Sequence, residues 1–222
     1  MGEVRIVKKA VKRIYLKVKP DGEAVLTVPP DVSQREIDHI LQKRAAWIAR
    51  QRKNFAAVPR RTEPEYVSGE NIRYLGRNYR LKVIAENDER VSLQRGQLRL
   101  FVRDTRATRI KKALVEGWLR AKAERHFTEA LARFAPLIGD RPYHLRIRTM
   151  KTRWGSCNHQ TGNITLNLRL IEKPKICIEY VALHELAHLL HPHHGRAFYD
   201  FLSLHMPDWK ERKARLERDG LR

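Results

Sequence analysis

The sequence predicts an α+β fold, and three patterns in its 222 residues support this fold class. Segments in which apolar and polar residues alternate, as in half-buried strands, concentrate before residue 104 and recur within residues 143–171. Apolar residues at helical spacing dominate residues 31–55 and 108–134. Strands and helices do not alternate regularly along the chain, so a sheet built from repeated βαβ units is not expected.

The N-terminal portion, residues 1–104, is expected to be rich in β structure and to contain one helix. Apolar and polar residues alternate on both sides of Pro20-Asp21-Gly22, which is typical of two strands joined by a tight turn. Ser33 and Glu36 form a capping-box pattern, which predicts the start of a helix. The other segments expected here are that helix at 31–55, a linker at 56–70, and strand pairs broken by glycine at 71–84 and 90–102.

The C-terminal portion, residues 105–222, is expected to form a separate domain. Pro174 suits the first turn of a helix, and Pro192 should stop that helix, because proline lacks the N–H that a helix interior needs. Trp154, Gly155 and Ser156 are expected to form a packed turn between two strands. The predicted elements are a long helix at Thr108–Phe134, strands at 143–150 and 164–171, the helix between the two prolines, and further helices at 195–206 and 208–220.

Composition limits the compartment and the partners. Lys and Arg number 46 against 25 Asp and Glu, and the resulting charge of +21 favours polyanions such as nucleic acid or nucleotides as partners. A basic surface that only keeps the protein soluble is the alternative, since the cationic residues are scattered. The two cysteines, Cys157 and Cys177, form no C-x-x-C pair. With no apolar run of about 18 residues and no signal-peptide pattern, we expect a cytoplasmic protein without a membrane partner.

The segment 184–194 contains five histidines and predicts a metal site. His184 and His188 are four residues apart on the expected helix, so their side chains project from the same face. Glu185 completes an H-E-x-x-H pattern, in which two imidazoles bind zinc and the Glu acts as general base. The metal lowers the pKa of a bound water to about 7, within reach of such a base. A helix that buried these three side chains without a metal would need a hydrogen-bond partner for each of them.

A catalytic zinc usually has a third protein ligand and one open position. His191 shares the helical stripe, but the rise of the helix places it about 10.5 Å from His184, too far to bind the same ion. The third ligand is therefore expected after the chain turns at Pro192. Both His193 and His194 meet that condition, and their spacing from His184 does not choose between them.

Four segments of the chain carry a family resemblance. They are "IYLKVKPDGEAVLTVPPDVSQREIDHILQKRAAWI", "YLGRNYRL", "MKTRWGSCNHQTGNITLNLRLI" and "IEYVALHELAHLLHPHHGRAF". Together they resemble the YgjP-like metallopeptidase family, whose relatives are the SprT-like and WLM zincins. The resemblance implies a zinc-dependent hydrolase with a zincin-like catalytic core built around the H-E-x-x-H helix.

The resemblance also assigns roles to individual residues. It implies His184, His188 and His194 as zinc ligands and Glu185 as the general base. It thereby selects His194, although this chain carries His193 where the family commonly has Asn.

The sequence is compatible with three functions. The first is hydrolysis of a peptide or protein. The second is pyrophosphatase activity on a nucleoside triphosphate such as UTP, which is also attributed within the family and suits the charge; no P-loop is present, so Lys151 and Arg153 would hold the phosphates. The third is a nucleic-acid-associated binding protein with a structural zinc, which would need a fourth protein ligand such as Cys157 or His193.

Two further expectations concern the substrate. Arg153 has a planar, permanently charged donor fork, which suits a substrate carboxylate or phosphate, or alternatively a buried acid near the active helix. The segment 163–171 is the candidate strand for binding an extended peptide by β-addition, its alternative being an ordinary interior strand. Cys157, Phe198 and Phe201 are expected to be packing residues.

Overall fold

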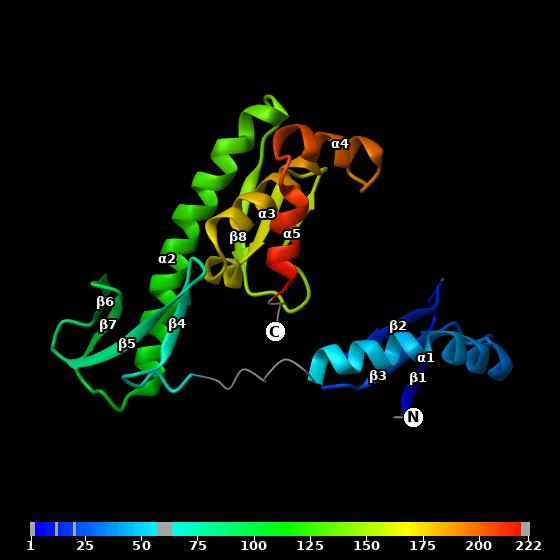
Figure 1. Cartoon of the computed structure of the whole chain (residues 1–222), viewed down its shortest axis with the longest axis horizontal. Coiled ribbons are helices and arrows are strands. Elements are labelled where there is room, and N and C mark those ends of the chain that lie inside the picture. The colour runs from blue at the N-terminus through cyan, green and yellow to red at the C-terminus, as the bar shows by residue number, and fades with distance from the viewer. Residues whose placement is uncertain (1–2, 12, 20, 57–63, 219–222) are drawn as a thin grey trace. The chain divides into compact units, whose positions relative to one another are not determined.

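The computed structural model describes residues 3–11, 13–19, 21–56 and 64–218 (Figure 1). The chain forms two compact units, residues 1–62 and 63–221. Of the linker expected at 56–70, residues 57–63 lie outside the described residues, and residues 64–70 belong to the second unit. The division that the sequence places after residue 104 stays a prediction.

The first unit is a three-stranded sheet covered by one helix. Strands β1 (Val4–Lys8), β2 (Tyr15–Val18) and β3 (Ala24–Val28) lie in the order β1-β3-β2, with β2 antiparallel and β1 parallel to β3. The hairpin predicted around Asp21-Gly22 is therefore present, and β1 adds to its far side.

The helix α1 (Gln34–Ala56) begins at the predicted capping box. The backbone N–H of Glu36 donates to Ser33 Oγ, and the backbone N–H of Ser33 donates to Glu36 Oε2 at 3.1 Å. Ile37 and Ile48 of its apolar stripe are buried against the sheet. The first unit thus has a small core of its own.

The second unit begins with a four-stranded sheet, ordered β4-β5-β7-β6. Its strands are β4 (Asn71–Tyr74), β5 (Arg77–Ala85), β6 (Arg90–Gln94) and β7 (Gln97–Val102). The two hairpin turns, Leu75-Gly76 and Arg95-Gly96, have positive φ at both residues, as two-residue turns that match strand twist require. The Leu75-Gly76 turn also contacts the C-terminal half of the unit: the N–H of Leu75 donates to Ile171 O at 2.9 Å, and the N–H of Gly76 donates to Glu172 O at 3.0 Å.

The helix α2 spans Thr108–Phe134, the predicted bounds, and is about 40 Å long. Near its start, Val115 packs with the four-stranded sheet. Towards its end, Phe127 and Leu131 are fully buried in the core of the C-terminal half. One helix therefore belongs to both hydrophobic clusters, which is why residues 63–104 form one compact unit with the residues that follow them.

A second three-stranded sheet lies in the C-terminal half. Strands β8 (His144–Arg148), β9 (Gly155–Asn158) and β10 (Asn163–Asn167) are ordered β8-β10-β9. Two predictions are wrong here: residues 155–158 form a strand rather than a turn, and the strand expected to reach residue 171 ends at Asn167, where the 3-10 helix η2 (Leu168–Glu172) begins. Since β10 has a neighbour on each side, its expected role in β-addition is also wrong.

Three helices complete the unit: α3 (Lys175–Ala187), α4 (Arg196–His205) and α5 (Trp209–Arg218). Nearly all of α3 is buried, as expected for a helix that is apolar around its circumference. Its buried Glu179 accepts from Arg133 of α2 at 2.8 Å and from Arg212 of α5 at 2.7 Å, so charge pairs fix α3 between its neighbours. Pro174 precedes α3, as predicted, and the helix ends at Ala187, before Pro192.

The α+β prediction is confirmed, since sheets and helices occupy successive parts of the chain rather than alternating units. None of the helices formed by the described residues has the length and apolar character that crossing a membrane requires.

Candidate metal centre

Three histidine side chains converge at the end of α3. His184 lies in the last turn of α3, His188 is the residue that caps it, and His194 lies just before α4. One ring nitrogen from each residue lies within 4.8 Å of the other two. The Nε2 atoms of His184 and His194 are 3.1 Å apart. Neither His191 nor His193 belongs to this group.

The donor set fits a zinc ion. At a zinc–nitrogen distance of about 2.05 Å, tetrahedral geometry places two ligand nitrogens about 3.3 Å apart, close to the separation of His184 and His194. His188 Nδ1 donates to the carbonyl of His191 at 3.2 Å, which leaves its Nε2 free as a ligand atom. Among the described residues the group contains three ligands, and Cys157 is not one of them, so it lacks the fourth ligand of a closed structural site.

The surroundings of His184 and His188 favour the neutral imidazole, which is the form that binds metal. Burial, followed by the proximity of His188 and His194, lowers the pKa of His184 to about 3. Burial also lowers the pKa of His188. The Nδ1 of His184 is buried without a hydrogen-bond partner among the described residues.

The ring of Phe198, on α4, packs against all three imidazoles. Its centroid lies 5.0 Å from that of His184, 4.8 Å from that of His188 and 4.7 Å from that of His194. Phe198 is fully buried. It is therefore a core residue, as expected, and its ring also packs against the three imidazoles and restricts their positions.

Glu185 is buried beside this group and faces β9. Burial raises the pKa of Glu185 to about 8, while the positive charge of Arg153 opposes the rise. Gly155 of β9 lies so close that a Cβ there would be 2.4 Å from Glu185 Oε1. Burial, with the charge of Glu185, raises the pKa of the Cys157 thiol to about 12, so this residue is a neutral thiol near the carboxylate. The backbone of β9 thus forms one wall around Glu185.

Comparison with known families decides the identity. The model of the family described as "YgjP-like, metallopeptidase domain" matches residues 12–219. The chain belongs to the YgjP-like metallopeptidase family. The resemblance drawn from the sequence motifs is therefore confirmed, and the YgjP-like chain is a metallohydrolase whose family implies a catalytic metal.

Solved structures similar to this YgjP-like chain include two archaeal metallopeptidase zymogens. Abylysin of Pyrococcus abyssi is 24% identical over 43% of this chain and 99% of its own, with a TM-score of 0.39. Jannalysin of Methanocaldococcus jannaschii is 20% identical over 41% of this chain and 94% of its own, with a TM-score of 0.38. Comparison with curated proteins finds no match.

Arg153 of the YgjP-like chain is exposed, and its side chain makes no ion pair with another described residue. Its backbone is fixed by Asn167, which is fully buried and donates from Nδ2 to Arg153 O at 2.9 Å and to Met150 O at 2.8 Å. Asn167 Oδ1 accepts from the N–H groups of Met150 and Arg169. One amide side chain therefore holds the loop before β9 at both ends, and the charge of Arg153 in this loop acts on Glu185.

Two residues of the site were not predicted from the YgjP-like sequence. Gly155 contacts Glu185, and a glycine within a strand often marks a close approach of backbone to another group, so "RWGSC" carried that signal. Phe198 lies in the first turn of α4, four residues after His194, and this closeness in the sequence was available as a signal too.

Proposed function

We propose that the chain is a zinc metallopeptidase in which His184, His188 and His194 hold the ion and Glu185 is the general base. A zinc ion bound there supplies a Lewis acid that activates water and polarises a carbonyl oxygen. The convergence of three imidazoles beside one buried carboxyl is the observation that carries the proposal.

Glu185 moves the protons. A positive charge nearby lowers the pKa of a carboxyl, so Glu185 would be ionised when His184, His188 and His194 hold a cation. That carboxylate takes a proton from the attacking water and later gives it to the leaving amine of the peptide. The walls formed by Gly155 and Cys157 keep the carboxylate dry and restrict its position.

The edge of β9 supports a peptide substrate. The N–H of Asn167 donates to Trp154 O, so alternation along this antiparallel pair directs the main-chain groups of Gly155 and Cys157 away from β10. These groups face the edge of β9 that has no neighbouring strand among the described residues. An extended peptide pairing there would run past Glu185, and Arg153 at the start of β9 would meet a substrate carboxylate.

One activity panel tests the proposal. The zinc-loaded chain is offered casein and UTP, and Glu185→Gln serves as the control because it keeps the shape of the side chain. Hydrolysis of casein that Glu185→Gln abolishes, with zinc retained, is the expected result. Hydrolysis of UTP without hydrolysis of casein would show that the site acts on phosphate substrates instead of peptides. Full activity of Glu185→Gln would refute the assignment of Glu185 as the general base.

The third ligand is tested separately. His194→Ala should lose zinc, whereas His193→Ala should keep it, because only His194 lies in the group of converging nitrogens. Zinc analysis of the two purified variants gives the answer, and loss of zinc from His193→Ala alone would overturn the ligand set.

A further inference from the structure

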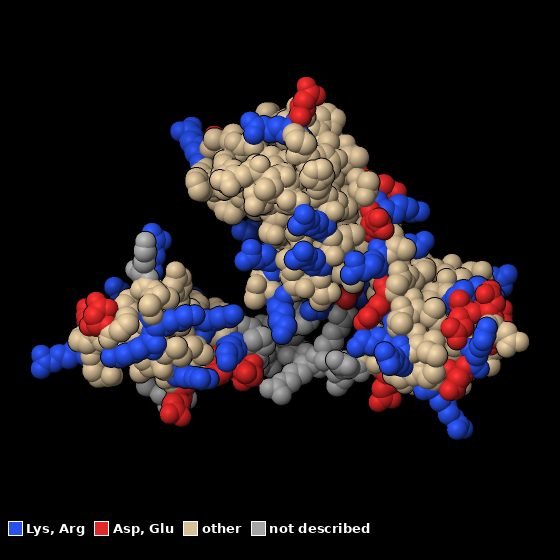
Figure 2. Space-filling model, turned by 180° about the vertical axis from the view of Figure 1, so that it is seen from behind, with Lys and Arg blue, Asp and Glu red and all other residues tan. Residues whose placement is uncertain are grey.

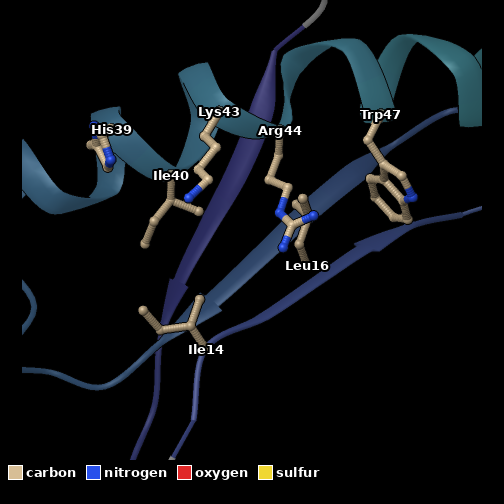
Figure 3. A pocket seen from close by; sticks show the side chains of 7 residues that line it. All are labelled: Ile14, Leu16, His39, Ile40, Lys43, Arg44 and Trp47. Carbon is tan, nitrogen blue, oxygen red and sulfur yellow. The ribbon is translucent and has the colours of Figure 1, made fainter.

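The first unit contains a groove of about 590 Å³ between the helix α1 and the strand β2 (Figure 3). Figure 3 shows the labelled side chains of α1 on the side of the helix that faces Leu16 of β2 and Ile14, the residue just before β2. All the lining residues belong to the first unit, so the groove is separate from the metal centre. The lining residues are Ile14, Leu16, His39, Ile40, Lys43, Arg44 and Trp47.

The groove has an apolar floor and a cationic rim. Ile14, which is 40% exposed, Leu16 and Ile40 supply branched aliphatic surface to the floor. Lys43 and Arg44 are exposed at the rim, and no carboxylate lines the groove. Neither cation has a hydrogen bond or an ion pair with another residue that the structure describes.

The strand beside the groove has a free edge. Within residues 3–11, 13–19 and 21–56, β2 pairs only with β3. The N–H of Lys19 donates to Glu23 O at 2.8 Å, so alternation along the antiparallel pair turns the main-chain groups of Leu16 and Val18 outward. Unpaired N–H and C=O groups at a sheet edge are a template for another extended chain.

We propose that this groove binds an extended acidic segment of a polypeptide, which adds to the edge of β2 as a further strand. Main-chain hydrogen bonds to Leu16 and Val18 supply affinity, and side chains on the groove-facing side of the segment supply specificity. An aliphatic side chain fills the floor, and a neighbouring carboxylate on the same side meets Lys43 and Arg44.

Charge and shape together select this occupant. Residues 1–62 contain 15 Lys and Arg against six Asp and Glu. Figure 2 shows more Lys and Arg than Asp and Glu on the visible face of the first unit. Such a surface attracts acidic polypeptides and nucleic acid alike. A floor of branched aliphatic side chains suits an aliphatic residue, whereas a nucleic-acid base would stack on aromatic faces, and of the seven lining residues only Trp47 and His39 carry an aromatic ring.

The test is a binding measurement on the full chain carrying Glu185→Gln, so that no probe is cleaved. The probe is a fluorescent peptide of repeated Leu-Thr-Glu-Thr, which places Leu and Glu on one side of an extended chain. Reversing both rim charges, with Lys43→Glu and Arg44→Glu, should weaken binding about tenfold or more. Arg35→Glu with Arg50→Glu, exposed on α1 outside the groove, is the matched control and should change affinity much less.

Two further readouts separate strand addition from charge attraction. Hydrogen exchange at the amides of Leu16 and Val18 should slow when the peptide binds, and a peptide methylated at alternate backbone amides should bind about tenfold more weakly. Equal affinity for the rim and control variants would overturn the proposal, as would unchanged exchange at both amides. So would an oligothymidylate that displaces the peptide and protects neither amide, since that result identifies a nucleic-acid site.

Discussion

Replacing Gly155 by Ala should disable Glu185 without removing the metal. A Cβ at position 155 would lie 2.4 Å from Glu185 Oε1 and 2.8 Å from its Cγ and Cδ atoms. Comfortable contact between such atoms requires about 3.5 Å, so the carboxylate has to withdraw by about 1 Å. A displacement of that size at a reacting group costs about a hundredfold in rate, or about 2.7 kcal/mol of transition-state stabilisation.

The assay is kcat/KM for casein hydrolysis by the zinc-loaded Gly155→Ala variant, with zinc content measured in the same sample. Gly117→Ala is the control, because a Cβ at this position of α2 meets no atom within 4 Å. Combining Gly155→Ala with Glu185→Asp removes a methylene where space is short, so the two substitutions should be less harmful together than their separate effects predict.

Two results would refute the reasoning. Full activity of zinc-loaded Gly155→Ala would show that the strand does not fix the position of Glu185. Loss of zinc in proportion to activity would show that β9 supports the histidines instead of the base.

Three other perturbations follow from the structure. The pKa of Glu185 rises from 4.5 to about 8 on folding, so the folded metal-free chain keeps a proton that the unfolded chain releases, and stability should fall as pH rises through this window. Glu185→Gln should remove that part of the fall, on the order of a few kcal/mol, in denaturant unfolding with a chelator. The opposite contribution of His184 is present in both chains and cancels in the comparison, so an unchanged slope between pH 4.5 and about 8 contradicts this. Phe198→Leu should weaken zinc binding about tenfold in a competition titration, since the ring supports all three imidazoles; wild-type affinity would show that it only fills the core. Asn167→Ala should lower the free energy of unfolding by about 2–4 kcal/mol, because main-chain groups of the loop before β9 lose their hydrogen-bond partner. A free energy of unfolding within about 0.5 kcal/mol of the wild-type value, as at an ordinary surface site, would refute that.

Local signals predicted what depends on local structure. The capping box of Ser33 and Glu36 fixed the start of α1, and the bounds of α2 followed from its apolar spacing. The geometry of H-E-x-x-H brings His184 and His188 together because residues four apart share a helix face. Spacing left His193 and His194 open, and the structure brings His194 to the group because α4 begins directly after it.

Non-local pairing set the limit of prediction. Gly155–Asn158 is short and mostly small or polar, and it becomes a strand because β10 pairs with it. Leu168–Ile171 continues the apolar–polar alternation of β10, and so short a continuation does not distinguish further strand from a helical turn that buries Leu170 and Ile171. The division after residue 62 depends on how β4–β7 pack against α2, which no local pattern reveals. The expected functional division into residues 1–104 and 105–222 stays a prediction.

The close contact between Gly76 and Pro174 makes the residue types at these two distant positions depend on each other. Gly76 has φ of 79°, and a Cβ there would lie 2.7 Å from Pro174 Cγ, directly before the helix that carries the histidines. A larger residue at 76 would push on that proline, and a different residue at 174 would leave a gap under the turn. We expect these positions to change together among homologues, and a transplant of the histidine helix into another scaffold needs both.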